Sequence, residues 1–136
     1  MRALAIVIVY GFAAYLIVLG VIALLDRGRA FRFLRGFAQT RRANAIEAAC
    51  RITVGVAFIV LAPDLPLRPA FLGFGWVLVL SAIAMLALPD LHRRFADRVV
   101  PAIALFLPLI GLVSLAAGSF LAIILWSLIA LGFSPY

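Results

Sequence analysis

Long stretches without a charged residue constrain the fold of this 136-residue chain more than any other feature. The first covers residues 3–25, and the last covers residues 101–133. About 20 apolar residues in a helix, at about 1.5 Å each, cross the roughly 30 Å hydrocarbon layer of a membrane. Both stretches reach that length, and 68% of all residues are hydrophobic. We therefore expect an all-α membrane protein, and not a soluble, disordered or disulfide-rich chain.

Four spans are predicted, and they form one domain over residues 1–136, a four-helix transmembrane bundle. The expected spans cover residues 3–25, 43–62, 70–88 and 101–133. The second span contains Glu47 and Arg51, and the third lies between two prolines. The fourth is longer than a membrane is thick, so we expect a kink at Pro108 or an interfacial turn before the span proper.

The basic residues are all arginine, and their distribution predicts a topology. Ten of the twelve lie in or beside the two loops after the first and third spans, and only Arg2 and Arg68 lie on the other side. Because loops rich in arginine stay in the cytoplasm, we expect both termini in the periplasm. Trp76, Trp126 and Tyr136 fall toward the outer ends of their stretches, as an aromatic belt requires. The absence of lysine is typical of GC-rich bacterial genomes, so we expect a multi-pass protein of the bacterial inner membrane.

Both arginine-rich loops have an amphipathic pattern, over residues 28–39 and 90–100, and we expect short interfacial helices there. In the first loop, Phe31 and Phe37 fall on the apolar side, and Arg32 and Arg35 fall on the other. His92 lies at the edge of the apolar side in the second loop and is interpreted as an interfacial residue rather than a haem or chlorophyll ligand. Arginines placed in this way indicate anionic lipid headgroups as partners, and no nucleic acid.

Glu47 and Arg51 form the one candidate ion pair within a span. They are four residues apart, so their side chains meet on one face of a helix. Arg51 lies about 16 Å from Ala62 along the helix, near mid-depth, where an unpaired charge costs about 2.5–3.5 kcal/mol or more. Two interpretations stay open: a functional pair within the membrane, or a structural pair that fixes the rotation of the helix.

Small residues share one face of the fourth span and predict close helix packing, within the bundle or against a partner. They are Gly111, Ser114, Gly118 and Ala122. The serines have no histidine or acid in the same half of the bilayer to activate them, and Cys50 is the only cysteine. The chain also has no phosphate-binding loop, paired carboxylates or metal-ligand spacing. We therefore expect no catalytic residue, no metal and no cofactor.

Two resemblances follow from short motifs. The first set of motifs comprises Glu47, Arg51-x-x-x-Gly55, Ala62-Pro63, Gly75-Trp76, Leu88-Pro89-x-x-His92 and Pro101. With these motifs the chain resembles small bacterial inner-membrane proteins with four spans, and the resemblance implies an architecture but no mechanism. Arg42-Ala43-Asn44-x-x-Glu47 is similar to part of the motif of the membrane-associated glutathione and eicosanoid enzymes. That family has two further residues before the Asn, and an Arg and Tyr pattern in later spans that is missing here.

Three function classes remain. The first is a non-enzymatic accessory or assembly subunit of a larger membrane complex, with other transmembrane proteins or its own copies as partners. The second is a small homo-oligomeric transporter; four-span drug exporters have a similar length, but they need a carboxylate in the first span, which has none here. The third is a glutathione-type membrane enzyme. We expect the first class.

Overall fold

The computed structural model describes all residues except 37–39, 89, 91–93, 96–97, 100–103 and 131–136. Over this described part every regular element is helical, which confirms the predicted all-α class. Four of the described helices are long and apolar enough to cross a membrane. They are α1 (Arg2–Leu25), α3 (Arg41–Leu61), α4 (Arg68–Ala87) and α6 (Leu107–Ala130).

Two side-chain caps and one tight turn explain where three of the helices begin. The short helix α2 (Arg27–Gly36) follows Asp26, whose carboxylate accepts a hydrogen bond from the backbone N–H of Arg29 at 3.0 Å. The hydroxyl of Thr40 caps α3 in the same way, through the N–H of Ala43 at 3.1 Å. A 3₁₀ turn, η1 (Ala62–Asp64), and the left-handed Leu67 then reverse the chain into α4.

The fourth spanning helix is shorter than the charge-free stretch that predicts it. A second 3₁₀ turn, η2 (Ala104–Phe106), precedes α6, which starts at Leu107. Pro108 is the second residue of α6, a position where the missing N–H has no partner to lose, so Pro108 does not interrupt the helix. Residues 101–103 and 131–133 of the predicted span lie outside the described residues, as does much of the predicted helix 90–100.

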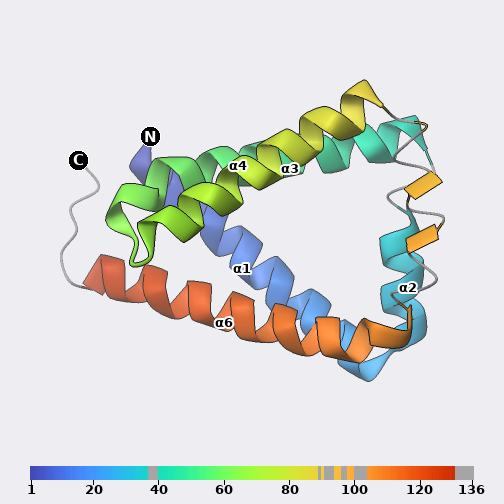
Figure 1. Cartoon of the computed structure of the whole chain (residues 1–136). Helices are drawn as coiled ribbons and strands as arrows, with labels where there is room; N and C mark the ends of the chain where they lie inside the picture. Colours follow the sequence, from blue (N-terminus) through green and yellow to red (C-terminus); the bar gives the residue numbers. More distant parts are fainter. Residues whose placement is uncertain (37–39, 89, 91–93, 96–97, 100–103, 131–136) are drawn as a thin grey trace.

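The spanning helices pack as two antiparallel pairs, α1 with α6 and α3 with α4 (Figure 1). Each pair has glycines where the two backbones meet. A methyl group added to Gly75 would lie 2.7 Å from the carbonyl oxygen of Gly55, and one added to Gly20 would lie 2.7 Å from that of Gly111. Each pair is therefore held by close backbone approach, which small residues permit.

The two pairs meet mainly through α1 and α3, near the end of the molecule that contains η1, here called the turn end. Phe58 is fully buried there and contacts the rings of Phe12, Phe71 and Phe74, with centroids 5.2–5.9 Å from its own for all three. Toward the opposite end, which carries α2 and is here called the arginine-rich end, the pairs diverge (Figure 1). A small second core joins α2 to α1 and α6 through Ala23, Ala30 and Leu107.

Candidate functional site

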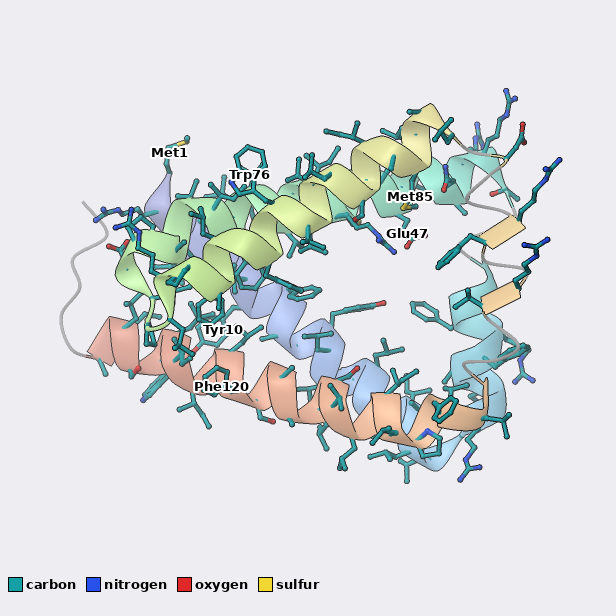
Figure 2. The ribbon with its side chains drawn as sticks, viewed as in Figure 1. Met1, Tyr10, Glu47, Trp76, Met85 and Phe120 are labelled. Carbon is teal, nitrogen blue, oxygen red and sulfur yellow. The ribbon has the colours of Figure 1, made fainter. Side chains whose placement is uncertain are left out.

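Glu47 and Arg51 form a hydrogen-bonded ion pair on α3. The Nε and Nη2 atoms of Arg51 donate to the same oxygen of Glu47, at 3.1 and 2.5 Å. The two side chains are 35% and 21% exposed, so the pair is only partly covered by the chain itself. Glu47 lies on the inner side of the α3/α4 pair, facing the space between the two helix pairs (Figure 2).

Arg51 also ties α3 to α4. Its Nη1 donates to the hydroxyl oxygen of Ser81 at 3.2 Å, and that hydroxyl donates to the carbonyl of Leu78 at 2.9 Å. Ser81 was not a candidate residue from sequence. The signal that could have found it is hairpin symmetry, because Arg51 precedes Leu65 in the turn by 14 residues and Ser81 follows it by 16. The hydrogen bonds of Arg51 therefore link α3 to α4 through side chains.

Asn44, from the glutathione-type motif, belongs to the same helix contact. Its side-chain nitrogen donates to the carbonyl of Met85 on α4 at 3.3 Å. Its side-chain oxygen is buried and has no hydrogen-bond partner among the described residues. Asn44 and Glu47 are thus each engaged within the α3/α4 pair, Asn44 with the backbone of α4 and Glu47 with Arg51.

A cavity of about 640 Å³ opens beside Arg51, toward the arginine-rich end. It lies against the second half of α4 and against described residues of the loop that follows α4, and its lining is part cationic and part apolar. The lining residues are Arg51, Ser81, Ala84, Met85, Leu88, Arg94, Phe95 and Arg98. Arg94 and Arg98 belong to the arginine-rich loop after the third predicted span, and the sequence does not predict that they line a cavity together with Arg51.

The small residues of α6 face α1 within the same chain. A methyl group on Gly118 would lie 2.7 Å from the carbonyl oxygen of Ala13, and one on Gly111 would lie 2.9 Å from the Cβ of Ala23. The carbonyl of Ala122 accepts a hydrogen bond from the Tyr10 hydroxyl at 3.3 Å. Ser114 is half-buried on the same helix. Gly111 and Gly118 are therefore used inside the chain and do not form a free docking face.

The predicted interfacial residues are placed only in part. Phe31 is half-buried against the small core of α1, α2 and α6, whereas Arg32 is exposed. Arg35 lies in α2, and its side chain is not described. Phe37 and His92 lie outside the described residues. The contact of Phe31 with this core means that α2 packs against α1 and α6 of the same chain.

The chemistry available at this site is charge pairing and hydrogen bonding. Within the described residues, no three His, Cys, Asp or Glu side chains come together as a set that would hold a metal ion. The hydroxyl of Ser81 already bonds to Arg51 and to a backbone carbonyl, and neither is a base that would activate it. The arrangement suits recognition of an anionic or polar group beside the ion pair.

Comparison with known proteins gives no match. This holds for family models, for curated proteins and for solved structures.

Proposed function

We propose that this chain is a non-enzymatic, multi-pass protein of the bacterial inner membrane that serves as an accessory or assembly subunit of a larger membrane complex. In this proposal the four long helices form a transmembrane bundle, and the partners are other transmembrane helices or further copies of the chain. The hydroxyl of Ser81, which has no base beside it among the described residues, is in line with this role.

The distribution of charge supports the membrane orientation. At the turn end, Arg2 pairs with Asp64, with 3.5 Å between Nε and Oδ2, and Arg68 begins α4. The other end carries most of the remaining arginines: Arg27, Arg29, Arg32 and Arg35 in α2, and Arg41 and Arg42 at the start of α3. This asymmetry favours a cytoplasmic arginine-rich end and periplasmic termini.

The observation that carries the accessory role is how little of each span the chain itself covers. In the most apolar stretch of the four helices, only 17–33% of the residues are buried, and α4 has the lowest value. Trp76, Leu80 and Ile83 on α4 are each at least half exposed and follow one another at helical spacing. Figure 2 shows Trp76 pointing away from the other helices. This face is available to a neighbouring helix, which we propose as its occupant within the complex.

The test is purification from native membranes in a gentle detergent, with mass spectrometry of the proteins that accompany the tagged chain. We expect one membrane protein, or a further copy of the chain, at fixed stoichiometry. The variant Leu80→Ala/Ile83→Ala removes side chains from the exposed face of α4 and should release that partner. The matched variant Leu112→Ala/Ile123→Ala changes exposed α6 residues and should retain it. A monomeric chain that catalyses a reaction in isolation would overturn the proposal.

A homo-oligomeric transporter is the second candidate, and the cavity beside Arg51 favours it. The cavity has cationic and apolar walls, as one half of an alternating-access pathway for an anionic solute would have. Reconstitution into liposomes separates the candidates, because a transporter moves a solute without any other protein and an accessory subunit does not.

A further inference from the structure

We propose that the cavity beside Arg51 binds the phosphate group of an anionic phospholipid, with Arg94 and Arg98 as its ligands. This inference goes beyond the proposed function, since it requires no partner protein. A lipid headgroup and free inorganic phosphate both carry a phosphate anion, and of these two ligands the lipid fits the cavity.

Among the described residues that line the cavity, three carry a positive charge and none carries a negative charge. Of these three guanidinium groups, that of Arg51 is paired with Glu47 and bonded to Ser81. In the part of the chain that the structure describes, neither Arg94 nor Arg98 is paired with a carboxylate, and no acid lines the cavity. Guanidinium groups bind phosphate oxygens through paired N–H donors, so these two arginines match a phosphate.

The remaining walls of the cavity select a lipid over a free phosphate ion. Ala84, Met85 and Leu88 line it from the end of α4, and Phe95 lines it from the segment that follows. From Ser81 to Leu88 the wall extends about 10 Å along the helix. A volume of about 640 Å³ lies in the range of pockets that hold molecules of many atoms. Inorganic phosphate would leave the apolar wall uncovered, whereas glycerol and the first acyl carbons would cover it.

The position of the cavity also suits a lipid. Its lining includes Arg94 and Arg98 from the arginine-rich loop after α4, together with the Arg51 guanidinium on α3 and the Ser81 hydroxyl on α4. Basic pockets between helices near a membrane surface bind lipid headgroups in this way, with acyl chains directed toward the hydrocarbon layer.

The test uses native mass spectrometry of the purified full-length chain with palmitoyl-oleoyl phosphatidylglycerol or the matching phosphatidylcholine. We expect at least about tenfold tighter binding of phosphatidylglycerol, and a loss of about fivefold or more in Arg94→Gln/Arg98→Gln. The control is Arg27→Gln/Arg32→Gln, which removes the same charge from exposed α2 positions outside the cavity and should change binding less than about twofold. Ala84→Phe fills the cavity with all charges kept, and it should also weaken binding about fivefold.

Three outcomes would overturn the proposal. The first is equal binding of the two lipids. The second is an equal loss in both arginine pairs, which would assign the effect to the general basic surface. The third is displacement of the lipid by millimolar inorganic phosphate alone, which would make the cavity an anion site without a lipid. Because the experiment uses the isolated chain, its result does not depend on whether co-purification finds a partner protein.

Discussion

Arg51 brings together the polar contacts that matter most in this chain. It is partly exposed, and it is paired with Glu47 on its own helix and hydrogen-bonded to Ser81 on the next. A pair of this kind balances its own desolvation but adds little net stability. Removing one partner is therefore much more damaging than removing both.

The first prediction concerns that pair. Arg51→Leu leaves the Glu47 carboxylate without its counter-charge and should lower the free energy of unfolding by about 2 kcal/mol, less than a fully buried pair would lose because both groups are partly exposed. Glu47→Leu/Arg51→Leu should return to within about 1 kcal/mol of the parent, because both charges are gone. Equilibrium unfolding in mixed micelles measures both variants.

Arg41→Leu is the matched control, since Arg41 is exposed at the start of the same helix and should shift stability by less than about 0.5 kcal/mol. If the double variant were as unstable as Arg51→Leu alone, the pair would do more than neutralise itself, and the functional interpretation would gain support.

A second prediction uses two glycines that lie two residues apart on α4. Gly75→Ala should lower the free energy of unfolding by about 1–3 kcal/mol, because the new methyl group meets the Gly55 backbone at 2.7 Å. Gly73→Ala has nothing within 4 Å of the added carbon and should change stability by less than about 1 kcal/mol, with alanine favoured in a helix. Thermal unfolding in detergent compares the two. Equal effects would show that α3 and α4 are not in close backbone contact.

At the scale of elements, the positions of the helices were predictable and their packing was not. Charge-free stretches mark α1 and α4 because a helix crossing a membrane excludes charge over about 20 residues. The spans are apolar on nearly every side, so periodicity cannot tell which face meets which neighbour. For this reason the sequence does not decide whether Gly111 and Gly118 pack within the bundle or against a partner, whereas in the structure both pack against α1.

The packing of α2 was likewise not predictable from the sequence. Its amphipathic pattern predicts an apolar side but not what covers that side, because lipid and protein are equally apolar neighbours. Ala30 is fully buried against Ala23 and Leu107, so the protein itself covers part of that side. The candidate site was also predictable only in part. The spacing of Glu47 and Arg51 on one helix predicts their contact, whereas the three-dimensional fold is needed to show that Arg94 and Arg98 line the cavity.

A third prediction tests the docking of α2. Ala30→Trp overfills the contact with α1 and α6 and should raise amide hydrogen exchange across residues 27–36 by about tenfold or more, since local opening limits exchange there. Arg32→Trp places the same side chain on the exposed side and should leave exchange within about twofold of the parent. Slow exchange in Ala30→Trp would mean that the bilayer, and not α1 and α6, holds this helix.

At the scale of the whole molecule, the chain is two helix pairs joined at one end. The join is built around Phe58, which has no exposed surface and touches α1 through Phe12 and α4 through Phe71 and Phe74. Because the larger core lies at the turn end, the arginine-rich end opens around the ion pair and the cavity. The position of this join thus determines at which end of the molecule the cavity lies.

The fourth prediction is that Phe58 holds the pairs at a fixed separation. Phe58→Ala should lower the free energy of unfolding by about 3–5 kcal/mol and let the pairs move relative to each other, because the cavity it leaves lies between them. Spin labels on the native Cys50 of α3, which is exposed, and on Leu112→Cys of α6 report that separation by pulsed electron resonance. The distance distribution should be narrow in the parent and broad in Phe58→Ala.

Phe120→Ala is the control for that measurement, because it removes the same ring from an α6 position that is 50% exposed. It should cost less than about 1 kcal/mol and leave the distribution narrow, since its ring is not part of the join. A narrow distribution in Phe58→Ala would mean that other contacts at the turn end, such as the Arg2–Asp64 pair, suffice to fix the two pairs, and that the open end does not depend on the aromatic cluster.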